Sequence, residues 1–267
     1  MRASIVLLLV ALVAAPSEAA RKSPPGGVYA RHALAIDADT GEVLFAKNDR
    51  YVVPIASITK LMTALVVRAQ EADLDSVVTT TRALRRGAGR TRVKVGDRVR
   101  MEDLLHLSLM VSDNFATREL AAHAGLDAEA FVDSMNARAA ALGMEDTRFV
   151  EVTGLSDENV STVHDVATLL QVATTDSVLA AVMRKRGHAF TSESGRAYEF
   201  PNTNRMVYDR YPVRGGKTGH IGNAGYCIVT WLHHREREVI AVVLGSVNSP
   251  TRFNDVRRIL RRIRAAS

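Results

Sequence analysis

Runs of β-type residues lie near both ends of this chain, and the patterns between them are mostly helical. Residues 33–36 and 43–46 flank the turn-rich segment 37–41, which predicts a hairpin. Strand patterns return in the last third of the chain, at residues 198–200, near Val213, at 224–232 and at 239–247. Strands at both ends with helices between them predict an α+β fold: an antiparallel sheet flanked by terminal helices, with an inserted helical lobe.

Helical spacing of apolar residues fills most of the middle of the chain, at residues 57–69, 101–110, 114–124, 127–142 and 166–174. Thr162 resembles the start of a capping box before the last of these segments. We therefore interpret His164 as a first-turn surface residue and not as a catalytic base. Two alternating segments, 77–81 and 91–100, are predicted to be exposed strands, the second turning at Gly96.

The first 19 residues are typical of an export signal. Arg2 supplies a positive start, residues 5–15 an apolar run too short to span a bilayer, and residues 17–19 a small-residue cleavage site. Residues 20–28 are interpreted as a flexible spacer, and residues 29–267 as one folded domain. We therefore expect an exported protein, periplasmic or otherwise extracytoplasmic, that is soluble after the signal is removed.

The net charge of +6 is unevenly distributed along the chain. Beyond residue 249 there are six Arg and only one acidic residue, Asp255, so we interpret this segment as holding nearly all of the excess of positive over negative charge. Its apolar residues recur at helical spacing: Phe253, Val256, Leu260 and Ile263. A final helix with a solvated basic back is the simpler interpretation, and a weak contact with an anionic cell envelope is the functional alternative. Export argues against a nucleic-acid partner.

The residue types that bind metals are scattered along the chain. The eight His form no zinc-binding spacing, and His233 and His234 lie beside alternating charges in a predicted exposed turn between strands. The lone Cys227 lies in an apolar run and is interpreted as a small buried thiol. We therefore expect neither a metal nor another cofactor.

Three short motifs carry residue types suited to catalysis. Ser57 and Lys60 are three residues apart where a helix is predicted to begin after Pro54, so both side chains lie on one face. A serine is a poor nucleophile until a neighbour takes its proton, which an unprotonated lysine one turn away can do. Taken alone, the pair is also compatible with a serine near a helix start and a solvated lysine behind it. Two further motifs follow: Ser112-Asp113-Asn114 between two helices and Lys217-Thr218-Gly219 in a Gly-rich run before a strand.

This ordered set of motifs is the one found in penicillin-binding proteins and class A β-lactamases. A closer resemblance, to the D-alanyl-D-alanine carboxypeptidase family of low-molecular-mass penicillin-binding proteins, is carried by residues 54–64, 153–155, 159–161 and 217–225. The resemblance covers about residues 29–263. It implies a β-lactamase/transpeptidase-like fold with residues 29–267 as the catalytic domain. Residues 202–205 and the short C-terminal part look most like the endopeptidase branch of the family.

The resemblance also implies a role for each catalytic residue. Ser57 would attack the carbonyl between two D-alanine units and form an acyl-enzyme. Lys60 would be the base, with its pKa lowered by desolvation and by the like charge of Lys217. Ser112 would relay the proton to the leaving amine, and Asn114 would offer its amide to Lys60 and to the substrate backbone.

Other residues of the resemblance would bind the substrate. Lys217 and Thr218 would hold its carboxylate or the neighbouring carbonyl, and Gly219 would let it lie against this segment as an added strand. The backbone N–H groups of Ser57 and His220 would form the oxyanion hole.

Arg205 and Arg252 are further candidates for a carboxylate contact, although either can equally be a surface ion-pair residue. With these roles, the resemblance implies a serine DD-peptidase that acts on peptidoglycan stem peptides. It would work as a D-Ala-D-Ala carboxypeptidase, a cross-link endopeptidase or both, and β-lactam antibiotics such as penicillins would acylate it.

Two alternative functions share parts of this pattern. A class A-like β-lactamase uses a carboxylate in a Glu-x-x-x-Asn loop to drive water onto the acyl-enzyme, and neither Glu151 nor Glu158 has an Asn at that spacing. A non-catalytic wall-binding protein on the same fold should have lost at least one motif, and all three are intact.

Overall fold

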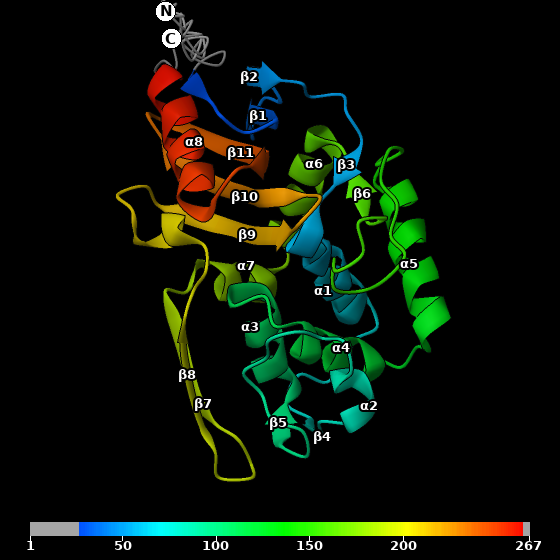
Figure 1. The fold of residues 1–267 in the computed structure, drawn as a ribbon. Helices are drawn as coiled ribbons and strands as arrows, with labels where there is room; N and C mark the ends of the chain where they lie inside the picture. Colours follow the sequence, from blue (N-terminus) through cyan, green and yellow to red (C-terminus); the bar gives the residue numbers. More distant parts are fainter. Residues whose placement is uncertain (1–26, 264–267) are drawn as a thin grey trace, which may run out of the picture.

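The computed structural model describes residues 27–263, and its centre is a five-stranded antiparallel sheet (Figure 1). The strands are β1 (His32–Asp37), β2 (Val43–Lys47), β9 (Val213–Ile221), β10 (Gly225–His234) and β11 (Arg237–Ser246). Their order across the sheet is β2-β1-β11-β10-β9, so the two ends of the chain pair directly, with Ala35 opposite Ala241. The predicted antiparallel sheet is confirmed, and β9 is one of its edge strands.

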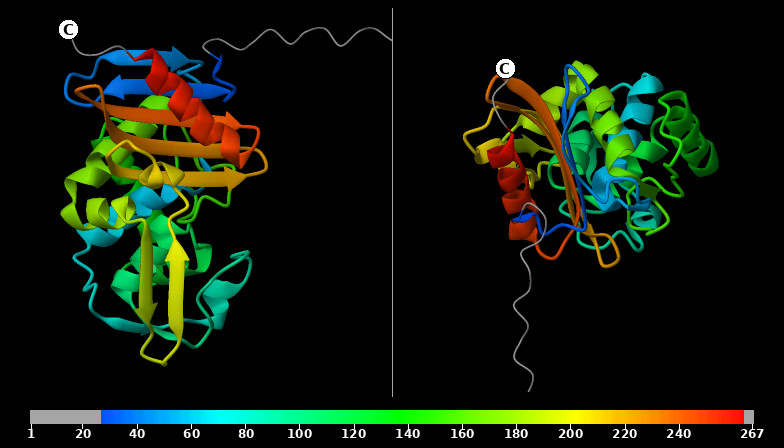
Figure 2. Two further views of the ribbon diagram at one scale, coloured as in Figure 1. Left: turned by 90° about the vertical axis from the view of Figure 1, so that its left-hand side faces the viewer. Right: turned by 90° about the horizontal axis from the view of Figure 1, so that it is seen from above.

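Helices cover both faces of this sheet, which is why β11 is buried at most of its positions (Figure 2). α8 (Ser249–Arg262) packs on one face, and α6 (Val163–Thr175) packs on the other. The apolar stripe predicted for the final helix is buried against the sheet: Phe253, Val256, Leu260 and Ile263. The rest of this helix is not a simple solvated back, because Arg252 and Asp255 are buried as well.

The N-terminal end of the described chain is hydrogen-bonded to α8 and to β2. Val28, which the sequence assigned to the spacer, is fully buried, and Lys47 Nζ donates to its carbonyl at 2.8 Å. The carboxylate of Asp255 accepts hydrogen bonds from the backbone N–H groups of Tyr29 and Ala30 at 3.0 and 2.8 Å. The predicted export signal lies outside the described residues.

The middle of the chain forms a helical lobe on the β9 side of the sheet (Figure 1). Its elements are α2 (Arg82–Arg85), α3 (Met101–Met110), α4 (Asn114–Ala122), α5 (Ala128–Ala141), α7 (Ser177–Arg184), the strand pair β4 (Val77–Thr79) and β5 (Arg98–Arg100), and the hairpin β7 (Gly187–Thr191) and β8 (Ala197–Pro201). α1 (Lys60–Ala69) packs against α3, α4, α5 and α6. β3 (Val53–Pro54) leads into α1 and pairs with β6 (Val160–Ser161). The lobe therefore faces the edge strand β9 across the start of α1.

The helix predicted at residues 57–69 is divided into two parts. A 3₁₀ turn, η2 (Ala56–Thr59), comes first, and the α-helix begins only at Lys60. Ala56 has a φ of 50°, which a right-handed helix does not contain. Pro54 lies in β3 and does not open the helix. Ser57 is thus held in a tight turn ahead of α1.

The strand predicted at residues 91–100 is only partly confirmed, because the observed strand is β5, Arg98–Arg100. Residues 91–97 form no strand, because their backbone groups bond to other loops: Arg92 N donates to the Asp113 carboxylate and Gly96 N to the carbonyl of Thr80. The sequence patterns also missed α2, α7 and β7, which are short and only partly buried.

Among residues 27–263, no single helix is long and apolar enough to cross a membrane. α6 and α7 meet the length and composition criteria only when taken together, and they are bent by 106° at the break between them.

Candidate active site

The serine and the lysine of the first motif meet at the start of α1. Ser57 lies in η2, and Lys60, the first residue of α1, is fully buried. Lys60 Nζ donates to Ser57 Oγ at 3.0 Å, to Asn114 Oδ1 at 2.7 Å and to the carbonyl of Thr153. In its neutral form, this amine is within reach to take the Ser57 proton directly.

Burial lowers the pKa of Lys60 to about 7, against the opposing effect of the Glu151 and Asp113 carboxylates. A large fraction of this amine is therefore neutral at physiological pH. The predicted effect of the Lys217 charge is not among the causes of this shift. The repulsion between the two lysines instead affects Lys217. Its pKa falls well below 10.5, through burial first and then through the charge of Lys60.

We expect the rate at which a penicillin acylates Ser57 to rise with pH and to level off above neutrality. The lowered pKa of Lys60, about 7, means that the neutral amine accumulates as pH rises through 7. A fluorescent penicillin and the second-order acylation rate, measured from about pH 5 to 9, test this directly. Thermal melting at each pH controls for unfolding. A flat profile, or one with its midpoint near 10, would contradict the assignment of Lys60 as the base.

The second motif brings a hydroxyl to the other buried lysine. Ser112 lies between α3 and α4 with a φ of 62°, and its Oγ accepts a hydrogen bond from Lys217 Nζ at 2.9 Å. Asp113 caps α4 by accepting backbone N–H groups of its first turn, so its carboxylate has a structural task. Asn114 binds Lys60 through its side-chain oxygen. Lys60 is thus paired with the serine of its own motif, and Lys217 is paired with the serine of the second motif.

The third motif lies on β9, whose outer edge pairs with no other strand of residues 27–263. Thr218 Oγ1 is within hydrogen-bond distance of Thr203 Oγ1, at 2.8 Å. Gly219 passes close to Ser57: a Cβ at this position would lie 2.9 Å from the backbone N of Ser57. A larger residue would push β9 away from η2, so this glycine allows the strand to lie beside Ser57.

The chain and its fold have known relatives. The family model for the D-alanyl-D-alanine carboxypeptidases, peptidase family S11, matches residues 18–248. The chain belongs to this family. A D-alanyl-D-alanine endopeptidase from Pseudomonas aeruginosa is 36% identical, over 97% of this chain and 86% of its own length. The D-alanyl-D-alanine endopeptidase of Escherichia coli K12 is also 36% identical, over 85% of this chain and 74% of its own.

Solved structures agree with the family assignment of this S11 peptidase. The Streptomyces K15 DD-transpeptidase superposes with a TM-score of 0.78 at 27% identity, covering 88% of this chain and 97% of that one. The predicted family, its serine-peptidase class and the mixed α and β fold are confirmed.

The position after the third motif of this S11 peptidase is the exposed residue His220. Its ring stacks on Tyr226, with centroids 3.9 Å apart. Burial and then the charge of Arg252 lower the pKa of His220, so the imidazole is neutral at physiological pH. Its side chain is hydrogen-bonded to none of the catalytic candidates in the described chain, which leaves only its backbone for the predicted oxyanion hole.

The two arginine candidates differ in their surroundings. Arg252 is only 7% exposed, and its Nη1 donates to the carbonyls of Gly219 at 3.0 Å and Cys227 at 3.3 Å, so it is not a surface ion-pair residue. Burial lowers its pKa to about 10, which still leaves it charged at neutral pH. Arg205 is exposed at the start of η3 (Arg205–Tyr208), and both arginines line one cavity beside β9. Cys227 is buried, as predicted, and burial raises the pKa of its thiol to about 11.

One functional residue was missed by the sequence patterns. The Glu151 carboxylate accepts the backbone N–H groups of Thr153 at 2.7 Å, of Leu155 at 2.9 Å and of Gly154. These bonds hold the loop whose Thr153 carbonyl reaches Lys60. The segment Glu151-Val-Thr-Gly-Leu155 offered a weak signal, since only the turn at Gly154, with a φ of 77°, folds the chain back onto the carboxylate.

One group of side chains outside the cleft has metal-ligand types: Asp103 and His106 on α3 and His188 on β7. The two imidazole rings are stacked, with centroids 3.7 Å apart and planes 8° from parallel. A metal must lie in the plane of each ring it binds, and two parallel planes do not meet. Lys185 Nζ also lies 2.9 Å from His106 Nε2. These residues therefore join the β7–β8 hairpin to α3 and do not fit a metal.

Proposed function

We propose that this chain is a serine DD-peptidase that cleaves peptidoglycan stem peptides through an acyl-enzyme at Ser57. The observation that carries the proposal is the fully buried amine of Lys60, with a pKa of about 7, at 3.0 Å from Ser57 Oγ. Burying a lysine whose hydrogen-bond partners are all neutral oxygens destabilises the folded state, and a role as the catalytic base explains why the lysine is there.

In the acylation step, neutral Lys60 takes the Ser57 proton while Oγ attacks the carbonyl carbon of the penultimate D-alanine. The backbone N–H groups of Ser57 and His220 stabilise the oxyanion. The amide C–N bond then breaks, and the leaving amine receives, through Ser112, the proton that Lys60 took from Ser57, which leaves Lys60 neutral again. Water next adds to the ester carbonyl, giving a free carboxylate product and regenerating the Ser57 hydroxyl.

Binding along β9 orients the substrate for this attack. The open edge of β9 can accept the peptide backbone as an added strand. Thr218, Lys217 and Arg252 then surround the position of the substrate carboxylate. A penicillin carries a carboxylate at a similar distance from its reactive amide, so the same groups direct it to Ser57. Its leaving group stays attached after ring opening.

The relatives named endopeptidase support a further proposal, that this enzyme cuts D-alanine cross-links. We also propose that it is exported, with residues 29–267 as the catalytic domain and an extracytoplasmic site of action. Arg261 and Arg262, exposed at the end of α8, would add a weak contact with an anionic envelope.

Incubation with intact peptidoglycan and with a soluble stem pentapeptide, followed by mass measurement of both products, tests the function. We expect loss of cross-linked dimers, release of D-alanine, or both, and no product from protein first saturated with penicillin. Release of D-alanine without loss of dimers would remove the endopeptidase assignment. No product from either substrate would favour a wall-binding protein, and many turnovers of a penicillin would favour a β-lactamase. Such turnover is not expected, because loop N–H groups occupy the Glu151 carboxylate.

A further inference from the structure

A cavity of about 640 Å³ adjoins the third motif, and four of its lining residues are arginines. Its charged lining residues are Arg92, Arg205, Asp209, Arg252 and Arg257. Two contacts connect this cavity to the motif: Thr203, also in the lining, lies 2.8 Å from the Thr218 hydroxyl, and the Arg252 guanidinium donates to the carbonyl of Gly219. The cavity therefore lies directly beside the proposed position of the substrate carboxylate.

The positive charge of this cavity is not neutralised by the protein. Asp209 is engaged by Arg257 at 2.7 Å. Within residues 27–263, neither Arg92 nor Arg205 has a carboxylate within salt-bridge distance. Arg252 Nε is buried and has no hydrogen-bond partner. Guanidinium groups bind carboxylates in a planar, two-bond geometry, so this cavity suits a ligand with several carboxylates.

Both walls of the cavity are anchored to the catalytic motifs. On one side, the Asp113 carboxylate accepts Arg92 N at 2.6 Å and the Thr91 hydroxyl at 2.8 Å. On the other side, Thr203 N donates to the carbonyl of Met110 at 2.8 Å, two residues before Arg205. The two free arginines thus approach the cavity from segments that also hold the second and third motifs in place.

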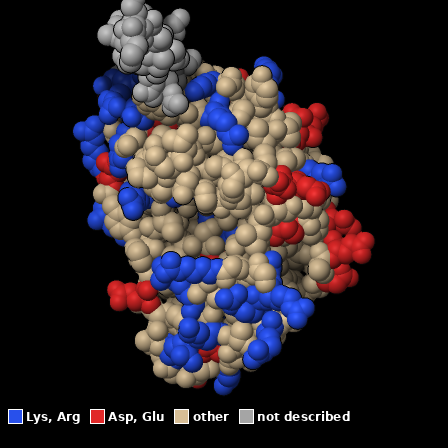
Figure 3. All heavy atoms as spheres, viewed as in Figure 1, with Lys and Arg blue, Asp and Glu red and all other residues tan. Residues whose placement is uncertain are grey.

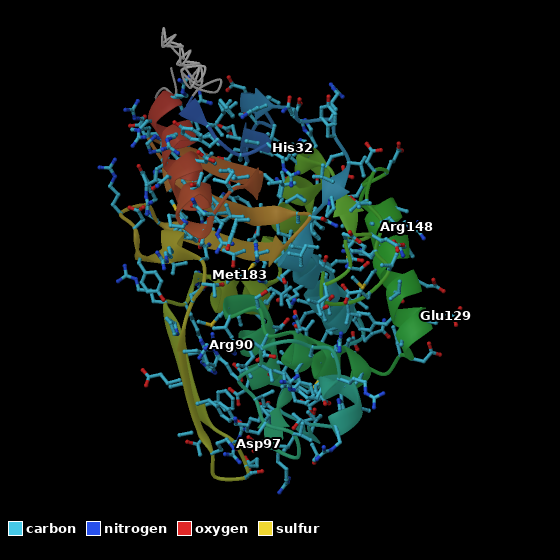
Figure 4. All side chains as sticks on the ribbon, in the orientation of Figure 1. His32, Arg90, Asp97, Glu129, Arg148 and Met183 are labelled. Atoms are coloured by element: carbon cyan, nitrogen blue, oxygen red, sulfur yellow. The ribbon has the colours of Figure 1, made fainter. Side chains whose placement is uncertain are left out.

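A larger basic surface continues from this cavity across the lobe. Residues 82–100 contain eight Arg and Lys against the single Asp97, an excess greater than that of the C-terminal segment. The interpretation that the C-terminal segment holds nearly all of the excess of positive over negative charge is therefore wrong. Figure 3 shows Lys and Arg gathered over the lobe on this face, and Arg90, labelled in Figure 4, belongs to the same segment.

We infer that the arginine-lined cavity is a subsite for the leaving-group part of a cross-linked substrate. This inference rests on the proposed peptidase function. A leaving D-alanine has one carboxylate, for which Thr218 and Arg252 suffice. The second stem peptide of a cross-link leaves as an amine with a carboxylate beside it and with further carboxylates along its chain. Arg92 and Arg205 bind those further carboxylates, which makes them specificity residues for cross-links over free stems.

The test compares R92Q/R205Q with a matched variant, K94Q/R98Q, which removes two exposed charges of the same surface outside the cavity lining. Three rates are measured for each protein: kcat/KM on a cross-linked muropeptide dimer, kcat/KM on a soluble stem pentapeptide, and acylation by a fluorescent penicillin. For R92Q/R205Q, we expect at least a roughly tenfold loss on the dimer and less than about twofold change in the other two rates. The matched variant should retain all three.

An unchanged dimer rate in R92Q/R205Q, or equal losses on dimer and pentapeptide, would overturn the subsite. Wild-type enzyme that cleaves the pentapeptide but not the dimer would overturn it too, while leaving the peptidase function in place. Wild-type enzyme that cleaves neither substrate would overturn the proposed function itself. Retained penicillin acylation in R92Q/R205Q shows that the variant is folded, so a selective loss on the dimer cannot come from unfolding.

Discussion

Replacement of Ser57 by Ala is expected to abolish the covalent penicillin adduct and to reduce peptidase turnover by about a thousandfold or more. The Ser57 hydroxyl would form the ester, and it lies 3.0 Å from Lys60 Nζ. The other hydroxyl of the first motif, that of Thr59, donates to the carbonyl of Ala56 instead. Intact-mass measurement after incubation with a penicillin reads the adduct directly. Turnover of a stem peptide provides the second measurement.

A suitable control for Ser57→Ala is Ser134→Ala, on α5 and hydrogen-bonded only within its own helix. This variant should keep both the adduct and the turnover. An adduct of full stoichiometry on Ser57→Ala would remove Ser57 as the nucleophile. A wild-type protein that is never labelled would instead support the non-catalytic alternative.

Replacement of Gly154 by Ala is expected to destabilise the fold by about 3 to 5 kcal/mol and to suppress acylation. The φ of Gly154 is 77°, and an added Cβ would lie 2.0 Å from the carbonyl oxygen of Ala56 and 2.8 Å from the backbone N of Ser57. Both are backbone atoms that cannot rotate away. Relief would require the 153–155 loop to move, which would withdraw the Thr153 carbonyl from Lys60. Urea unfolding and the penicillin acylation rate measure the two effects.

Gly195→Ala is the matched control for this substitution. Gly195 has nearly the same φ, 78°, but lies in the turn between β7 and β8 with nothing within 4 Å of an added Cβ. It should cost only the backbone strain of about 1 to 2 kcal/mol and leave acylation unchanged. If Gly154→Ala behaved like Gly195→Ala, the close approach of this loop to the nucleophile would not be required for function.

The sequence patterns succeeded where the signal was short in range. The three motifs were recognisable because each compresses its residue types into three or four positions, and the strands of the sheet because apolar runs ended at turns. Contacts between distant segments had no such signal. The sequence suggests for Glu151 only the role of a β-lactamase carboxylate, because its role in holding the loop at Lys60 depends on how residues 151–155 turn. Arg92 lies in a segment with the pattern of an exposed strand, and nothing local in that pattern indicates that it lines one cavity with Arg205.

The spacing of Ser57 and Lys60 follows from the sequence by itself, since three residues of helical backbone bring two side chains together whatever surrounds them. The apolar stripe of α8 is equally local, because it follows from backbone periodicity. The pKa of Lys60 is not local. It falls to about 7 mainly because the fold removes the amine from water, with Asn114 and Thr153 brought to it from 54 and 93 residues away. Only the tertiary structure decided that the lysine could serve as a base, because desolvation depends on every segment packed around it.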